Sequence, residues 1–281
     1  MEEKKINWFR KSPLLCLLLI SIVGYLGVPF LQTIWHSLQN DAVIESGAME
    51  DNLLVTAESI ADPDEAVEEI ASVSGNQAKE DEIKEFEIVD RSYLEDAVFI
   101  GDSRTVGLED YAGLEQSAFY AKTSLTIYEY DTLPFLKLED SEEKLTVDQA
   151  LQQHQFKKIY LMLGINELGT GTPEYFAAAY QKVIDRIREL QPDAVIFIQG
   201  IMRVTASKNE SDPIFNNTHI NERNFLLEQM ADNRHIFYLE MNNAVCDQDG
   251  NLSAEYTFDE VHLKASYYGL WVDYLLQHGI K

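Results

Sequence analysis

Residues 97–103 read AVFIGDS, a short apolar run that ends directly in glycine, aspartate and serine. A run of this length, closed by turn-forming residues, is typical of a buried strand. Comparable runs at 158–163, 194–198 and 236–239 predict three further strands, and residues 117–121 predict another. We therefore expect a sheet of five strands.

Helical patterns separate these runs. Thr172 and Pro173 form a typical helix start, with threonine at the cap and proline at the first position. The apolar residues that follow, up to Ile187, are spaced three and four apart, and further helices are predicted for 221–230 and about 265–275. Strands that alternate with helices imply a parallel sheet covered on both faces. The predicted fold is therefore an α/β three-layer sandwich with a central, mostly parallel five-stranded sheet.

Polar side chains gather where these strands are expected to end. Ser103 follows the first strand, Asn166 follows the strand at 158–163, and Asp259 with His262 precedes the last helix. Ligands of such sheets bind at the carboxyl ends of the strands. These residues are therefore candidates for a functional site.

The same residues suit acyl-transfer chemistry. A serine becomes nucleophilic when a base takes its proton, and the base needs a group that orients it. His262 is the candidate base, and Asp259, three residues earlier, can lie against its Nδ1 atom. Asn166 can donate to the developing oxyanion, together with backbone N–H groups of Ser103 and of a nearby loop.

Three motifs occur in order along the chain: VFIGDSR at 98–104, GINE at 164–167 and DEVHL at 259–263. In order and placement they resemble the SGNH, or GDSL-type, hydrolase family, from about residue 97 to the C-terminus. The resemblance implies a flavodoxin-like SGNH hydrolase fold and a serine esterase or acylhydrolase activity.

The resemblance also implies roles for single residues. Ser103 would be the nucleophile, His262 the general base and Asp259 the group that orients the base. The oxyanion hole would consist of the backbone N–H of Ser103, the Asn166 side chain and a backbone amide from the family's second motif.

The sequence departs from the family pattern at several places. The second-motif amide normally belongs to a glycine, but residues 121–125 read AKTSL, and Ser124 is the nearest match. A serine resists the positive φ that glycine adopts freely.

Glu167 replaces the usual aspartate, and we expect it to be a structural hydrogen-bonding residue. Arg104 is uncommon at its position. We expect it either to bind an anionic part of the substrate or to pair with a carboxylate. Arg203, at another strand end, is a further candidate for substrate binding.

Composition excludes several other classes of protein. The 281 residues are 46% hydrophobic and 25% charged, which fits one domain with additional segments. A net charge of −26 argues against a nucleic-acid partner, since such a chain repels phosphates. Two cysteines are too few for a disulfide scaffold or a cysteine-only zinc site. The chain lacks the Gly-x-Ser-x-Gly, His-Glu-x-x-His and P-loop patterns, and we expect no metal and no organic cofactor.

Residues 13–35 are uncharged and predominantly apolar, and as a helix they would be about 34 Å long, enough to span a bilayer. Residues 1–12 carry a net charge of +2, so the positive-inside rule places the N-terminus in the cytoplasm and the rest of the chain outside. We predict a single-pass signal anchor in the cell membrane. A cleaved signal peptide is the alternative.

Residues 36–90 contain sixteen acidic residues against two lysines and have no sustained periodicity. This composition predicts an extended, flexible stalk that holds the domain away from the bilayer. An interaction tail for basic partners is the alternative. The hydrolase domain is expected to cover residues 91–281.

Together these features predict a membrane-anchored serine esterase outside the cytoplasm. Its substrates would be O-acetyl or other ester groups on glycans or lipids of the cell envelope. An acyltransferase with a sugar hydroxyl as acceptor is one alternative, and a catalytically silent glycan-binding module is another. The missing second-motif glycine favours the silent module, whereas the intact triad counts against it. The oligomeric state is not predicted.

Overall fold

The computed structural model describes residues 83–138 and 143–281. These residues form one sheet of five parallel strands in the order β2-β1-β3-β4-β5. This result confirms the predicted α/β class and the number of strands. The strands are β1 Ala97–Gly101, β2 Ala118–Ala121, β3 Lys158–Met162, β4 Val195–Gln199 and β5 Ile236–Leu239.

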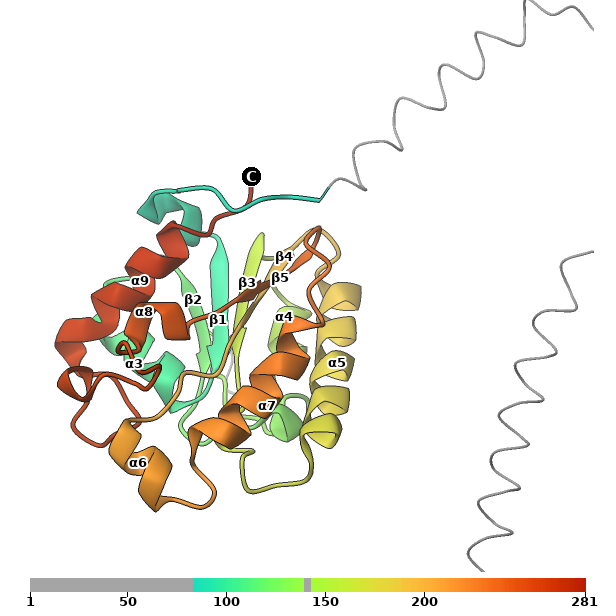
Figure 1. Cartoon of the computed structure of the whole chain (residues 1–281). Helices are drawn as coiled ribbons and strands as arrows, with labels where there is room; N and C mark the ends of the chain where they lie inside the picture. Colours follow the sequence, from blue (N-terminus) through green and yellow to red (C-terminus); the bar gives the residue numbers. More distant parts are fainter. Residues whose placement is uncertain (1–82, 139–142) are drawn as a thin grey trace, which may run out of the picture. The chain divides into compact units, whose positions relative to one another are not determined.

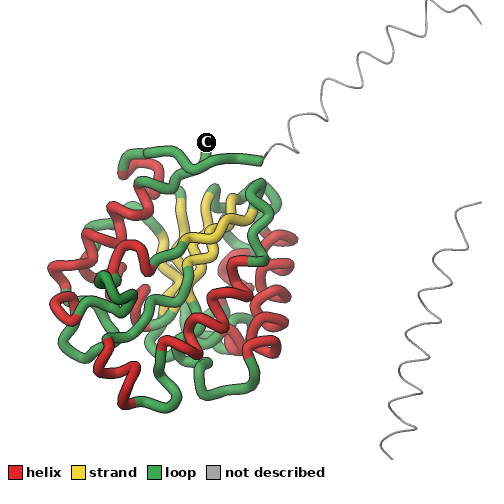
Figure 2. Tube along the Cα trace, in the orientation of Figure 1, coloured by secondary structure: helices red, strands yellow, loops and turns green. Residues whose placement is uncertain are grey.

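Helices cover both faces of the sheet, as Figures 1 and 2 show. One layer contains α3, α8 and α9, and the opposite layer contains α4, α5 and α7. The helices are α3 Ser103–Tyr111, α4 Val147–Leu151, α5 Pro173–Leu190, α6 Ala206–Ser211, α7 Asn217–Glu228, α8 Asn242–Val245 and α9 Tyr268–Leu276. Short 3-10 helices are η2 Arg91–Leu94, η3 Ile127–Glu129, η4 Ala254–Tyr256 and η5 Ala265–Tyr267.

Alternate residues of each strand supply two separate cores. In β1, Val98 and Ile100 pack in the core beneath α5 and α7, whereas Ala97 and Phe99 pack in the core beneath α3 and α9. This alternation follows from the two-residue period of a strand. Since both faces are buried, the strands read as continuous apolar runs in the sequence.

An aromatic row crosses the sheet on the α9 side. Phe119, Phe99, Tyr160, Phe197 and Phe237 lie on successive strands, and neighbouring ring centroids are 4.6–5.8 Å apart. Ring contacts at these distances add to the free energy gained from burial. The row therefore holds all five strands in register.

The long predicted helix is confirmed as α5. The Thr172 side chain accepts a hydrogen bond from the backbone N–H of Tyr175, and Pro173 occupies the first turn. The helix predicted for 221–230 begins earlier, at Asn217, because the Asn216 side chain caps its first turn.

Helix α3 was not predicted. Its buried face consists of Arg104, Thr105, Gly107 and Leu108, which form no apolar stripe that periodicity could reveal.

The folded unit begins before residue 91, the predicted start of the domain. The backbone N–H groups of Lys84, Glu87 and Val89 donate to carbonyls of Asn233, Gly279 and Leu276. Figure 1 shows this segment beside the C-terminus. The last residues of the predicted stalk are therefore hydrogen-bonded to the domain.

No helix within residues 83–138 and 143–281 is both long enough and apolar enough to cross a membrane. The predicted anchor at 13–35 and the basic segment 1–12 lie outside the described residues, as does most of the predicted stalk.

Candidate active site

Ser103 lies at the junction of β1 and α3. The Asp102 side chain caps α3 by accepting a 2.9 Å hydrogen bond from the backbone N–H of Arg104. Ser103 is therefore the first residue of the helix, and its own N–H has no partner within that helix. This N–H and the positive end of the helix can stabilise negative charge beside the hydroxyl.

The structure brings the three predicted triad residues together. Ser103 Oγ lies 2.8 Å from His262 Nε2, and His262 Nδ1 lies 2.7 Å from Asp259 Oδ2. The serine and the histidine are 159 residues apart in sequence. The chain of contacts has the order that a nucleophile, a base and an orienting carboxylate require.

Hydrogen bonds hold Asp259 in its ionised form. Its Oδ1 accepts from the backbone N–H groups of Val261 and His262 and from the Thr257 hydroxyl. Partial burial opposes ionisation, but the bonds from the His262 backbone, the His262 ring and the Val261 backbone lower the pKa of Asp259 well below its ordinary value. An ionised carboxylate keeps a proton on Nδ1 and leaves Nε2 free to accept the serine proton.

Ser124, the nearest match to the second-motif glycine, has a backbone conformation that glycine adopts freely. Its φ is 64°, in the left-handed region that favours glycine. A residue with a Cβ atom pays about 1–2 kcal/mol for this conformation. The loop therefore keeps a backbone conformation typical of glycine, although residue 124 is a serine.

Asn166 holds the loop that carries Ser124. Its Nδ2 donates to the carbonyl oxygen of Leu125 at 3.1 Å. An amide NH₂ group has two hydrogens, so one remains for a substrate oxygen.

Glu167 is a structural hydrogen-bonding residue, as predicted. Its carboxylate is fully buried, and Oε1 accepts a 2.6 Å bond from the backbone N–H of Ile127. Burial raises the pKa of Glu167 to about 7. Asn166 and Glu167, which are consecutive after β3, thus bind the same loop through Leu125 and Ile127.

The hydrogen bonds of Arg104 go to backbone carbonyls, and neither a substrate-facing position nor an ion pair with a carboxylate is among its contacts in the described residues. The side chain is 2% exposed, with Nε donating to the Val261 carbonyl at 3.2 Å and Nη1 donating to the Met202 carbonyl at 2.7 Å. Successive residues of a helix point about 100° apart, so Arg104 faces the interior while Ser103 faces the site. The guanidinium joins the loop after β4 to the loop that carries His262.

Arg203 is likewise engaged within the protein. Nε donates to Asn221 Oδ1 at 2.8 Å, and Nη1 donates to the Gly250 carbonyl at 3.1 Å. The guanidinium therefore connects α7 to the loop after α8, and these contacts give no support to the predicted substrate binding.

A second connection between the same loops was missed in the sequence. Glu260, between two triad residues, has φ 71° and accepts at its carbonyl from the Thr205 N–H at 3.1 Å. Its carboxylate accepts from the Thr205 hydroxyl at 3.3 Å. Thr205 and Glu260 are 55 positions apart in the sequence, and no local pattern of residues predicts their contact.

The model of the GDSL-like lipase/acylhydrolase family matches residues 99–270. No curated protein matches the sequence.

Among solved structures, the chain is similar to a protein described as a candidate platelet activating factor from Streptococcus pneumonia. The two share 18% sequence identity with a TM-score of 0.51, and the match covers 74% of this chain and 97% of that protein. This similarity supports the fold. A GDSL-like lipase from Bacteroides thetaiotaomicron has 14% identity and a TM-score of 0.48, covering 76% of this chain and 95% of its own. An acetylxylan esterase from Geobacillus stearothermophilus has 15% identity and a TM-score of 0.44, covering 64% and 91%.

Proposed function

The chain belongs to the GDSL-like lipase/acylhydrolase (SGNH) family of carboxylic ester hydrolases, and we propose that it removes short acyl groups, above all O-acetyl groups, from glycans of the cell envelope. The observation that carries the catalytic part is the contact chain from Ser103 through His262 to Asp259. The choice of substrate is supported by the exposure of the triad and by the predicted anchor.

The geometry supports a two-step serine mechanism. Ser103 Oγ attacks the ester carbonyl while His262 Nε2 takes the hydroxyl proton, which forms a tetrahedral oxyanion. The backbone N–H groups of Ser103 and Ser124 and the Asn166 amide donate to that oxyanion. His262 then protonates the departing alcohol, and the acyl group stays on Ser103. Water attacks this acyl-enzyme with His262 again as base, and the carboxylic acid leaves.

The exposure of the triad favours a bulky alcohol over a deeply enclosed acyl chain. The Asp259 side chain is 56% exposed and that of His262 is 38% exposed. A base so near the surface can reach an ester attached to a polymer, because the rest of the polymer can remain in solvent. A short acyl group such as acetate needs no long apolar channel.

The predicted anchor supplies the location. Residues 13–35 would hold the protein in the cell membrane, and the net charge of +2 on residues 1–12 would keep the N-terminus in the cytoplasm and so place the domain on the extracytoplasmic side. A reporter test checks this orientation: alkaline phosphatase fused after residue 281 is active only outside the cytoplasm. A fusion protein that is well expressed but has no phosphatase activity would refute the proposed location.

The decisive experiment compares the full-length protein with its Ser103→Ala variant. We expect p-nitrophenyl acetate to be hydrolysed faster than p-nitrophenyl decanoate, and an O-acetylated polysaccharide to release acetate. The variant should lose at least about 10³-fold in kcat/KM on each substrate. Equal activity of the two proteins would refute the triad, and a preference for decanoate would refute the short-acyl assignment. An acetylated product formed only with a sugar acceptor would identify a transferase instead.

A further inference from the structure

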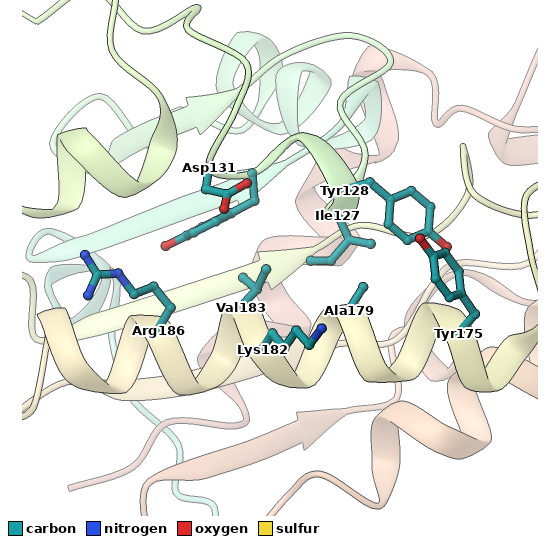
Figure 3. A pocket seen from close by; sticks show the side chains of 9 residues that line it. Ile127, Tyr128, Asp131, Tyr175, Ala179, Lys182, Val183 and Arg186 are labelled. Atoms are coloured by element: carbon teal, nitrogen blue, oxygen red, sulfur yellow. The ribbon is translucent and has the colours of Figure 1, made fainter.

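A pocket of about 270 Å³ lies between η3 and α5, outside the triad. Figure 3 shows its lining residues on the η3 segment and on the side of α5 that faces it. Its lining residues are Ile127, Tyr128, Tyr130, Asp131, Tyr175, Ala179, Lys182, Val183 and Arg186.

The pocket has an apolar floor and an aromatic end. Ile127, Ala179 and Val183 form the floor (Figure 3). At one end the rings of Tyr128 and Tyr175 meet with centroids 5.4 Å apart and planes tilted by 35°. Tyr175 is 59% exposed, so an aromatic surface faces solvent at the first turn of α5.

Charged groups border the same floor. The side chain of the exposed Lys182 makes no ion pair or hydrogen bond with any residue in the described part of the chain, and Figure 3 shows it lying along α5 with its ammonium group toward Ala179. Asp131 adds a carboxylate at the opposite wall. Arg186, by contrast, is already held by Asp148 and Glu189. Lys182 and Asp131 can therefore donate to and accept from a ligand.

We propose that this pocket is a sugar subsite that binds one pyranose ring of the glycan substrate. A pyranose has C–H faces, which pack against the electron-rich faces of tyrosines, and hydroxyls around its edge. The floor and the tyrosine rings match the C–H faces, whereas Lys182 and Asp131 match the hydroxyls. The volume lies just below the range of about 300–1,000 Å³ for drug-sized ligands, which suits a single ring. A fatty acyl chain would match the floor but would offer no hydrogen-bonding partner to the exposed Lys182 and Asp131.

The pocket wall continues into the loop after β2, which carries Ser124. Ile127, which lines the pocket, donates its N–H to Glu167, and Leu125, two residues earlier, accepts from Asn166. A sugar bound here would contact the same segment that carries Ser124. A sugar bound in the pocket would thereby place the rest of the glycan chain beside the loop after β2. This inference rests on the proposed glycan substrate and extends it.

Binding is tested without turnover in the full-length Ser103→Ala protein, purified in detergent. Calorimetric titration uses two soluble probes, a β-1,4-linked N-acetylglucosamine tetramer and xylotetraose, and sodium decanoate as the acyl probe. In this background we compare Tyr175→Ala and Lys182→Met with the matched controls Tyr111→Ala and Lys157→Met, which alter exposed residues outside the pocket.

We expect at least one tetrasaccharide to bind, Tyr175→Ala and Lys182→Met to raise its Kd at least 10-fold, and both controls to stay within 3-fold. Tyr175→Phe should retain binding, because it keeps the ring. The proposal is overturned if neither sugar binds, if the pocket variants bind as the controls do, or if only decanoate binding depends on Tyr175. Ester hydrolysis by the wild-type protein is a separate measurement, so failure of the subsite and failure of the esterase assignment are distinguishable.

Discussion

Arg104 Nε donates a hydrogen bond to the carbonyl oxygen of Val261, the residue that precedes the catalytic histidine candidate. The nucleophile candidate Ser103 and the buried arginine are adjacent in sequence, so one helix start both presents the hydroxyl and positions the base. The same guanidinium reaches the loop after β4 through Met202.

Arg104→Lys should therefore impair catalysis more than substrate binding. A lysine keeps the charge but cannot bond both the Val261 and Met202 carbonyls with the fixed geometry of a guanidinium. We expect kcat on p-nitrophenyl acetate to fall at least 10-fold while KM changes less than 3-fold. Arg91→Lys is the control, because Arg91 also donates to a backbone carbonyl, that of Ala112, but lies away from the site. A loss of kcat no larger than in the control would contradict the positioning role.

Asp259→Asn should remove most of the activity without unfolding the protein. The amide can present its NH₂ to Nδ1 and so stabilise the wrong tautomer of His262, which lowers kcat by about 10⁴-fold in a comparable triad. Steady-state kinetics and a thermal melt measure the two effects. Asp249→Asn, an exposed aspartate outside the triad, is the control and should keep wild-type rates. An Asp259→Asn enzyme with more than a tenth of the wild-type kcat would exclude the orienting role.

Glu167 should make stability depend on pH near neutrality. Its pKa rises from 4.5 to about 7 on folding because of burial, so the folded state binds the proton more tightly than the unfolded state. This contribution is fully present below about pH 4.5 and is lost as the pH rises through about 7, with a total of up to about 3 kcal/mol.

Glu167→Gln removes this titration and retains an acceptor for the Ile127 N–H. Urea unfolding at several pH values should show the wild type losing stability relative to the variant between about pH 5 and 7. A constant difference across that interval would show that Glu167 does not titrate there in the folded protein.

Ser124 offers a test of the loop after β2. Ser124→Gly keeps the N–H and removes the cost of the left-handed φ, so the variant should be as active as the wild type and up to about 1 kcal/mol more stable. Ser124→Pro removes the N–H and forces φ to about −65°, and kcat should fall at least about 10²-fold. Comparable rates in the two variants would remove Ser124 from the oxyanion hole. Circular dichroism checks that the proline variant remains folded.

Several features of the fold were predictable because they depend on neighbouring residues. The run at 97–100 marks a buried strand, and Thr172 with Pro173 marks the start of α5, since strand burial and helix capping leave local patterns. The three motifs likewise identified Ser103, His262 and Asp259 before their contacts were known.

The sequence by itself thus determined the α/β class, the strands and the identity of the triad candidates. Only the tertiary structure decided where Arg104 points, which loop Glu167 holds, and that Glu87 and Val89 bond to the C-terminal segment. The physical reason is distance along the chain. Contacts between segments 40 to almost 200 residues apart depend on how the whole sheet brings its loops together, and no local pattern of residues encodes that meeting.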